Sequence, residues 1–271
     1  MIHPTAIIAE SVILGERVSV GPYAVIQGNV ILEDDVTVKA HAYIEGNTRI
    51  GARSTIWPST SIGTQTQDRK STGENTQVVI GEEVTVREFV TINSSSHSGT
   101  QVVVGKGSLI MASCHIAHDC HLGEGVTMAN GVLLAGHVQV GEHAVLGGMT
   151  PIHQHVRIGR YAMVGGGSRV GRDVPPYTIG SGIPYRLGGI NRVGLKRHGF
   201  SQQDYREIFD LYRSTYLSGT SHLEAIEALK NIEGDSPLRG EWLAFFEGSK
   251  RGFSGANPHE ESLLFTESAN A

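Results

Sequence analysis

The chain has 271 residues, a formal net charge of −5 and an uneven composition, with 35 glycines and only 6% aromatic residues. Its 39% of hydrophobic residues exclude a disordered chain, and the glycines follow no three-residue period, which excludes collagen. The negative charge argues against nucleic acid as a partner. Two cysteines cannot build a disulfide scaffold, and no apolar run approaches the roughly 20 residues of a membrane span, so we expect a cytoplasmic protein without an integral membrane segment.

A period of six residues runs through the first two thirds of the chain. From Ile2 to Val170 there are 168/6 + 1 = 29 positions in this phase, and 26 of them hold a large aliphatic residue. The residue after each such position is often glycine, which we take to mark a tight corner where the φ angle is unfavourable for other residues. Three short strands then make one coil of about 18 residues, and successive coils stack as a β-solenoid.

We predict a mainly β protein in which this solenoid occupies residues 1–186. Two polar stretches, 64–77 and 94–101, interrupt the period and are expected to be loops. They are either tolerated surface insertions or the rim of a cleft. The period ends at Val174-Pro175-Pro176, because two prolines cannot continue a strand ladder.

A C-terminal α-helical domain, residues 187–271, is expected beyond this point. Twelve of the 17 aromatic residues lie after residue 176, and Ser201, Ser221 and Ser236 stand at helix starts, the last followed by a proline. We expect a Gly/Pro-containing link over 177–190, helices near 202–218, 222–232 and 237–249, and a loose tail after about residue 252.

Six histidines gather in one stretch of the solenoid: His115, His118, His121, His137, His153 and His155. His118, His137 and His155 are separated by 19 and 18 residues, about one coil, so we expect their side chains to stack along one edge. Such a row is compatible with a zinc hydratase, with an acyltransferase that uses a histidine base, or with a scaffold without catalysis. The neighbouring acid Asp119 favours the acyltransferase, and no metal site is predicted.

Six motifs carry a resemblance to a known family: QDRK (67–70), HIAHDC (115–120), LAGHV (134–138), GGMTPIHQ (147–154), DVPPY (173–177) and GLKRHGFS (194–201). Together with the start HPTAI and the helical C-terminal segment, they closely resemble the UDP-N-acetylglucosamine O-acyltransferases among the hexapeptide-repeat proteins. The resemblance implies a left-handed parallel β-helix, although the usual crossover rule favours the opposite hand. It also implies a homotrimer with its sites between subunits.

The resemblance implies a reaction as well. An (R)-3-hydroxyacyl group would pass from acyl carrier protein to the 3-OH of UDP-N-acetylglucosamine, the first step of lipid A biosynthesis. No cofactor is implied beyond the phosphopantetheine that carries the donor. His118 would be the general base, Asp119 would hold its ring in the right tautomer, and the backbone N–H of Gly136 would stabilise the oxyanion. A 3-amino sugar nucleotide remains an alternative acceptor.

The remaining site residues are also carried over from matching positions. Gly166 matches a position where a bulkier residue shortens the accepted acyl chain, so we expect a long-chain donor. Contacts with the nucleotide sugar or the phosphopantetheine are implied for Asp68, Lys70, His115, His137, His153, Gln154, Asn191 and Arg197. Residues 186–200 contain no acid. The expected dock for the acidic carrier protein consists of the four cations in this stretch: Arg186, Arg192, Lys196 and Arg197.

Overall fold

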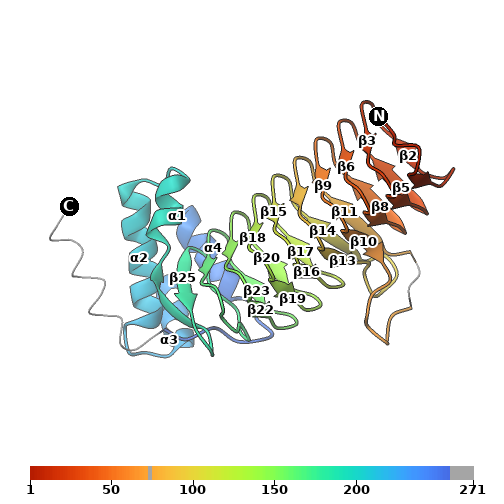
Figure 1. Ribbon diagram of the computed structural model, residues 1–271. Coiled ribbons are helices and arrows are strands. Elements are labelled where there is room, and N and C mark those ends of the chain that lie inside the picture. Colours follow the sequence, from red (N-terminus) through yellow and green to blue (C-terminus); the bar gives the residue numbers. More distant parts are fainter. Residues whose placement is uncertain (73–74, 257–271) are drawn as a thin grey trace.

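The computed structural model describes residues 1–72 and 75–256 of the chain. Its larger part is a three-sided stack of coils that begins at the N-terminus and ends against a helical part (Figure 1). Each side of the stack is one sheet, and the strands of successive coils pair in parallel. The predicted β-solenoid is confirmed.

The strands are very short, because each coil turns three corners. The first sheet contains β1 (Ile7–Ile8), β4 (Val25–Ile26), β7 (Tyr43–Ile44), β10 (Ser61–Thr64), β13 (Thr91–Asn93), β16 (His115–Ile116), β19 (Leu133–Leu134) and β22 (Pro151–Ile152). The second sheet contains β2 (Ile13–Leu14), β5 (Asn29–Leu32), β8 (Asn47–Ile50), β11 (Gln77–Ile80), β14 (Gln101–Val104), β17 (His121–Leu122), β20 (Gln139–Val140) and β23 (Arg157–Ile158). The third sheet contains β3 (Ser19–Val20), β6 (Thr37–Val38), β9 (Thr55–Ile56), β12 (Thr85–Val86), β15 (Leu109–Ile110), β18 (Thr127–Met128), β21 (Val145–Leu146), β24 (Met163–Val164), β25 (Thr178–Ser181) and β26 (Arg186–Ile190).

From β1 to β24, paired residues in successive coils are 18 positions apart except across the two loops, and the last pairing, of Met163 with Ile179, spans 16 positions. Ser61 pairs with Thr91, and Thr91 pairs with His115, which are offsets of 30 and 24. The two excursions therefore add 30 − 18 = 12 and 24 − 18 = 6 residues. Both are multiples of the repeat, which explains why the period of six keeps its phase across the two loops.

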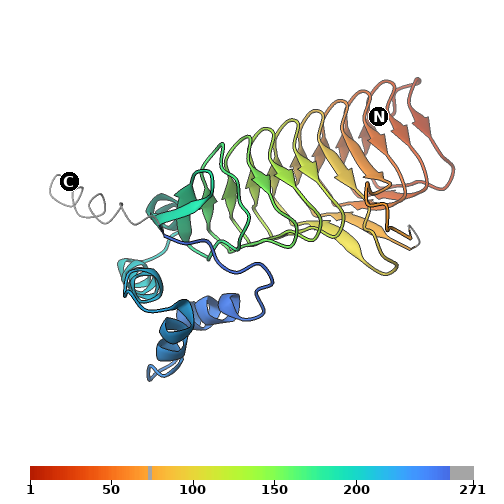
Figure 2. The ribbon, with the colours of Figure 1, turned by 90° about the horizontal axis from the view of Figure 1, so that it is seen from below.

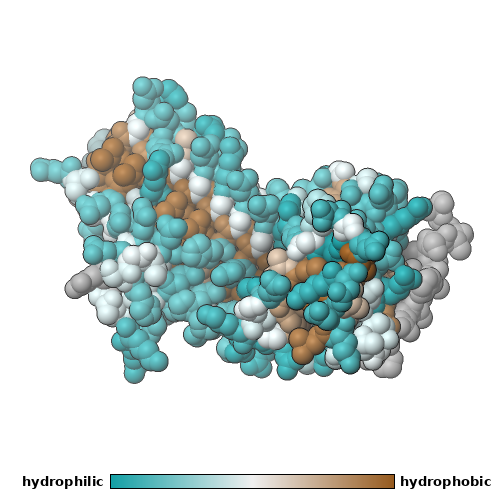
Figure 3. Space-filling model, turned by 180° about the vertical axis from the view of Figure 1, so that it is seen from behind, coloured by the Kyte–Doolittle hydropathy of each residue, from teal (hydrophilic) through white to brown (hydrophobic). Residues whose placement is uncertain are grey.

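The aliphatic residues of the period fill the interior of the stack. From Val20 to Val170, every residue in this phase outside the two loops is buried. The first coil has no neighbour on its outer side, and Ile2 and Leu14 remain 41% and 37% exposed there. On the face seen in Figure 3, apolar residues also form a band on the outer surface that follows the stack towards the helical part.

The predicted reason for the corner glycines is wrong. Most of them have an ordinary φ angle, and the left-handed residues lie two positions further on, where they are mostly not glycine. Glycine is needed because the next coil is too close for a side chain. A Cβ on Gly81 would lie 2.7 Å from the backbone nitrogen of Lys106, and one on Gly123 would lie 2.8 Å from that of Glu142.

Among the described residues, the C-terminal part contains four helices, which pack beside the last coils (Figure 2): α1 (Arg192–Arg197), α2 (Gln202–Tyr216), α3 (His222–Lys230) and α4 (Pro237–Phe246). The three predicted helices correspond to α2, α3 and α4, and Ser201, Ser221 and Ser236 cap them as expected. Within residues 1–72 and 75–256, no helix is both long and apolar enough to cross a membrane.

The junction between the two parts differs from the expected link. Residues 177–190 contain the antiparallel pair β25 and β26, so the predicted boundary at 186/187 falls inside β26. The chain also returns to the solenoid after α4, where Phe253 bridges to Asp173 and Ala256 bridges to Leu187. The predicted loose tail otherwise falls on residues 257–271, outside the described residues.

Candidate active site

Both loops and the histidine row lie at one edge of the solenoid. The loops follow β10 and β13, and His118, His137 and His155 lie in the corners after β16, β19 and β22. These five strands are successive members of the first sheet, so the segments that follow them project at the same edge. The loops therefore border the histidine row and are not scattered surface insertions.

The corner conformation arranges the three imidazoles in a row. His137 and His155 have φ angles of 61° and 64°, in the left-handed region that histidine tolerates better than most residues. The ring of His137 meets the ring of His118 edge-on at 5.0 Å and stacks on the ring of His155 at 4.5 Å. The predicted row of imidazoles is confirmed.

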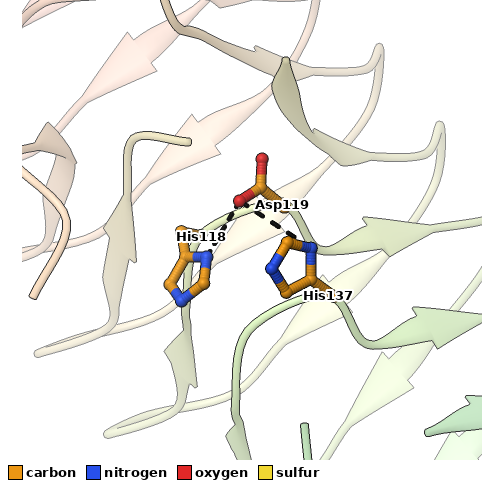
Figure 4. A group of neighbouring side chains, drawn as sticks. All are labelled: His118, Asp119 and His137. Carbon is orange, nitrogen blue, oxygen red and sulfur yellow. Dashed lines mark hydrogen bonds and ion pairs between the residues drawn. The ribbon is translucent and has the colours of Figure 1, made fainter. Parts of the chain in front are cut away.

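His118 and Asp119 form a hydrogen-bonded pair in this row (Figure 4). Asp119 has a φ angle of 58°, and its Oδ2 lies 2.8 Å from Nδ1 of His118. A carboxylate only accepts hydrogen bonds, so Nδ1 carries the proton and Nε2 keeps its lone pair. Burial opposes ionisation of Asp119, but hydrogen bonds from Ser96 and His118 outweigh it and hold the pKa of this carboxyl well below its usual range. The pair thus consists of an ionised acid and a base.

Gly136 packs against the ring of His118. A Cβ at this position would fall 3.0 Å from Nδ1 of His118 and closer still to Cε1 and Nε2, so a side chain here would displace the His118 ring. The carbonyl of Gly136 accepts the N–H of His155 at 3.1 Å, whereas the N–H of Gly136 has no acceptor among the described residues. A free N–H beside a base can stabilise an anionic oxygen.

Three more predicted residues adjoin the pair. Oδ2 of Asp68 lies 4.0 Å from Nε2 of His118, and Oδ1 of Asp68 accepts the N–H of Lys70 at 2.9 Å. The side chain of Lys70 is exposed and forms no ion pair with the described residues. His115 lies on β16, with Nδ1 2.8 Å from Oγ1 of Thr91. Burial and the nearby His118 lower the pKa of His115, which favours the neutral imidazole.

His153 and Gln154 lie in the corner after β22, next to His155, and both are exposed. Nε2 of Gln154 is 3.1 Å from Nε2 of His155, which joins this corner to the end of the histidine row. Nδ1 of His153 is 3.1 Å from the carbonyl oxygen of Gln154. Both residues therefore lie beside the last imidazole of the row.

Three residues predicted to bind substrate or to limit the acyl chain lie away from this edge. Asn191 caps α1: its Oδ1 accepts the N–H of Gly194 at 3.0 Å, and its Nδ2 donates to the carbonyl of Tyr161 at 2.8 Å. Arg197 is exposed in the last turn of α1. Gly166 lies in the corner after β24 of the third sheet, so it borders the first sheet on the side opposite to His118.

Residues 173–254 match the family model for UDP-N-acetylglucosamine O-acyltransferase, domain 2. Residues 101–136 match the bacterial transferase hexapeptide model, and residues 1–97 match the GMPPB C-terminal domain. The acyl-[acyl-carrier-protein]–UDP-N-acetylglucosamine O-acyltransferase of Chlamydia trachomatis serovar L2 is 49% identical over 97% of this chain and 94% of its own length. The enzyme of the same name from Chlamydia caviae is 46% identical over 93% and 90%. The chain belongs to the UDP-N-acetylglucosamine O-acyltransferase family.

A solved structure of this O-acyltransferase family supports the fold. The UDP-N-acetylglucosamine acyltransferase of Bacteroides fragilis aligns with a TM-score of 0.90 and 35% identity, over 93% of this chain and 99% of that one. The left-handed parallel β-helix with a C-terminal helical part is thereby confirmed.

Membership of the O-acyltransferase family does not favour the zinc hydratase. The closest metal-ligand set among the described residues, His118, Asp119 and His137, has its ligand atoms within 4.8 Å of one another. It offers two imidazoles and a carboxylate, not the three imidazoles that the hydratase interpretation requires.

Two groups of residues near these sites carry no signal in the sequence. Ser96 contacts Asp119, and nothing in the polar run SSSHSGTQ indicates which serine does so. The second group is a set of arginines around a cleft of about 710 Å³, where the predicted Arg186 is joined by Arg169, Arg172 and Arg251. None of these four forms an ion pair with the described residues. They come from segments that sequence spacing does not bring together.

Proposed function

We propose that the chain transfers an (R)-3-hydroxyacyl group from acyl carrier protein to the 3-OH of UDP-N-acetylglucosamine, the first step of lipid A biosynthesis. The observation that carries the proposal is the His118–Asp119 pair, with atoms 2.8 Å apart and the free N–H of Gly136 against the same ring. The activity named for relatives at 46% and 49% identity supports it. Those names specify an oxygen acceptor, so the 3-amino sugar is not favoured.

In the proposed reaction, Nε2 of His118 takes the proton from the sugar 3-OH while that oxygen attacks the thioester carbonyl carbon. The carbonyl oxygen becomes an anion that accepts the N–H of Gly136. When the intermediate collapses, the C–S bond breaks and His118 returns the proton to the departing sulfur. The ionised Asp119 stabilises the imidazolium between these steps. A general base contributes about 10²–10⁴ in rate and an oxyanion donor about 10²–10³.

This chemistry needs no cofactor, because the donor arrives on the phosphopantetheine of the carrier protein. The positive charges of Lys70 and Arg197 suit the diphosphate of the nucleotide sugar. The other proposed contacts supply hydrogen-bonding groups to the sugar, the base or the phosphopantetheine: Asp68, His115, His137, His153, Gln154 and Asn191. Of these, Asn191 has both ends of its amide engaged within the chain.

A homotrimer is proposed because the route from His118 to Gly166 is apolar and uncovered. Leu133 on β19 of the first sheet is 46% exposed, and Met149 in the corner before β22 is 74% exposed. An acyl chain that starts at His118 would follow this surface towards Gly166. A second copy laid over it would bury both the acyl chain and the apolar side chains.

The carrier protein is proposed to dock on two basic groups. Arg192, Lys196 and Arg197 belong to α1, whereas Arg186 lines the cleft that also holds Arg169, Arg172 and Arg251. Uncompensated guanidinium groups suit an acidic partner or a phosphate.

A cytoplasmic location is proposed because the reaction uses a carrier-bound thioester and a nucleotide sugar. Cys114 and Cys120 are free and buried, which fits a reducing compartment.

The test is an assay of the purified protein with (R)-3-hydroxyacyl-carrier protein and UDP-N-acetylglucosamine, read by mass spectrometry of the product. His118→Ala is expected to lower kcat by about 10²–10⁴ because the base is lost. His121→Ala is the control, since His121 is exposed on β17 of the second sheet. A wild-type protein that forms no product would refute the function, and a variant within tenfold of wild type would refute the base. Light scattering on the same sample tests for three copies of 29.1 kDa.

A further inference from the structure

The loop after β13 brings a serine against the carboxylate of the proposed base pair. Ser96 is 0% exposed, and its Oγ lies 2.6 Å from Oδ2 of Asp119. The backbone N–H of Ser96 points to the same oxygen at 3.3 Å. That oxygen also accepts the hydrogen bond from His118. We propose that Ser96 is a positioning residue for the acyl transfer, which fixes the carboxylate that orients the base. This inference rests on the proposed function.

The direction of each hydrogen bond follows from the chemistry of the groups. The ionised Asp119 only accepts, so the hydroxyl proton of Ser96 points to Oδ2. Oγ of Ser96 then faces Nδ1 of His97, 2.6 Å away, with a lone pair, so this nitrogen carries a proton and donates. His97 donates to Ser96, Ser96 donates to Asp119, and His118 donates to the same carboxylate. His97 therefore holds the hydroxyl of Ser96 in its donating orientation.

Both loops hold this serine in place. The carbonyl of Ser96 accepts Oγ of Ser71 at 3.0 Å and the N–H of Thr72 at 3.2 Å. The carbonyl of His97 accepts the N–H and Oγ1 of Thr100 at 3.1 and 2.7 Å. Ser71 and Thr72 belong to the loop after β10, so the longer excursion supports the shorter one. The two loops therefore hold Ser96 in place in addition to bordering the histidine row.

Loss of the Ser96 hydroxyl would leave the negative charge of Asp119 less compensated beside His118. Besides Asp119, the titratable groups beside His118 are Asp68, 4.0 Å from Nε2, and His137, with its ring 5.0 Å away. The imidazoles of His115 and His155 also interact with His118, because a charge on His118 contributes to lowering the pKa of each. None of these is altered by a substitution at Ser96. The carboxylate of Asp119 would lose a donor, and its less compensated charge would hold a proton on His118 at higher pH.

The experiment compares steady-state kinetics of three variants with wild type across pH. Ser96→Ala is expected to lower kcat by roughly tenfold to a hundredfold, part of the total contribution of a general base, with KM for both substrates nearly unchanged. The acidic limb of its pH profile should move to higher pH. Ser96→Thr keeps a hydroxyl and should recover most of the rate. Ser94→Ala is the matched control, because the half-buried Ser94 has no side-chain hydrogen bond to the described residues.

The outcomes separate this inference from the function on which it rests. A Ser96→Ala variant with wild-type kcat and an unmoved acidic limb would overturn the positioning role and leave acyl transfer intact. A threonine variant as slow as the alanine variant would assign the defect to packing and also overturn it. If Ser96→Ala folds poorly, His97→Ala serves in its place. It is expected to move the acidic limb of the pH profile to higher pH by a smaller amount. An acidic limb unchanged in His97→Ala would overturn the inference. No transfer by wild type refutes the function itself.

Discussion

Single glycines set how closely successive coils approach. A Cβ on Gly81 would meet the backbone of Lys106 at 2.7 Å, closer than real side-chain carbons come to such atoms. Gly171 occupies the same position of the repeat near the end of the solenoid, and nothing lies within 4 Å of a Cβ placed there. The two glycines are alike in the sequence and differ only in whether a coil follows closely.

This difference predicts two opposite effects on stability. Gly81→Ala is expected to lower the free energy of unfolding by about 1–3 kcal/mol, because the backbone of the next coil must move. Gly171→Ala is expected to leave it unchanged or to raise it by about 0.4–1 kcal/mol, because alanine restricts the unfolded chain. Denaturant unfolding measures both. Equal losses in the two variants would contradict the close-approach explanation.

The six-residue period predicts the positions of the site residues that lie within it. The distances between His118, His137 and His155 in the sequence match one coil, so their alignment follows from the period. The contact of Asp119 with the ring depends on its left-handed conformation, which a corner residue of this fold adopts. Ser96 could not be predicted, because it lies in an excursion where no repeat fixes the path of the chain.

At the scale of elements, the corner after β24 sets the proposed limit on acyl length. Gly166 is exposed, and a Cβ on it would come closest to the carbonyl oxygen of Gly148, at 3.2 Å. Gly166→Met is expected to shorten the preferred donor. The ratio kcat/KM should fall by about fourfold for each methylene that no longer fits, since a buried CH₂ contributes about 0.8 kcal/mol. Competition between donors of several lengths measures this, with the shortest donor as the control, and an unchanged preference would refute the role of Gly166.

The helices with capping signals are predicted well, and the connecting elements are not. Ser201 and Ser221 each form a capping box, so α2 and α3 begin where the sequence places them. The six residues of α1 contain Gly194 and bury only Leu195, so no apolar period indicates this helix. The pair β25–β26 was expected as a link because its Gly and Pro residues are typical of loops. The antiparallel pair joins the last coil through the parallel pairing of β25 with β24, a tertiary contact that local signals do not contain.

At the scale of the whole molecule, a buried carboxylate fastens the helical part to the solenoid. Asp173 is 0% exposed and accepts hydrogen bonds at 2.9 Å from Nε of Arg157 and from Oγ of Ser249. Arg157 also donates to the carbonyls of Phe245 and Glu247 at the end of α4. The hydrogen bonds that join Asp173 and Arg157 to the C-terminal part connect residues at least 76 positions apart in the sequence. No period relates them, so sequence analysis could not place the two parts together.

This arrangement creates the arginine cleft, which predicts how the carrier protein is recognised. The double variant Arg169→Glu, Arg186→Glu is expected to raise KM for the acyl-carrier protein by about tenfold, with little change in KM for the nucleotide sugar. The effect should shrink as salt is added, because salt screens exposed charges. Arg213→Glu on α2 is the control, since Arg213 is exposed and pairs with Asp210. If the double variant raised the KM for the acyl-carrier protein and the KM for the nucleotide sugar equally, the carrier protein would dock elsewhere.

The stack has one finished end and one open end. Each coil contacts only the coils next to it, so its resistance to local unfolding depends on a neighbouring coil on each side. The first coil lacks an outer neighbour and leaves Ile2 and Leu14 partly in water, whereas the hairpin β25–β26 and the helices cover the other end. Hydrogen exchange should therefore be fastest in the first coil and slower in the interior coils, where the proposed catalytic edge lies.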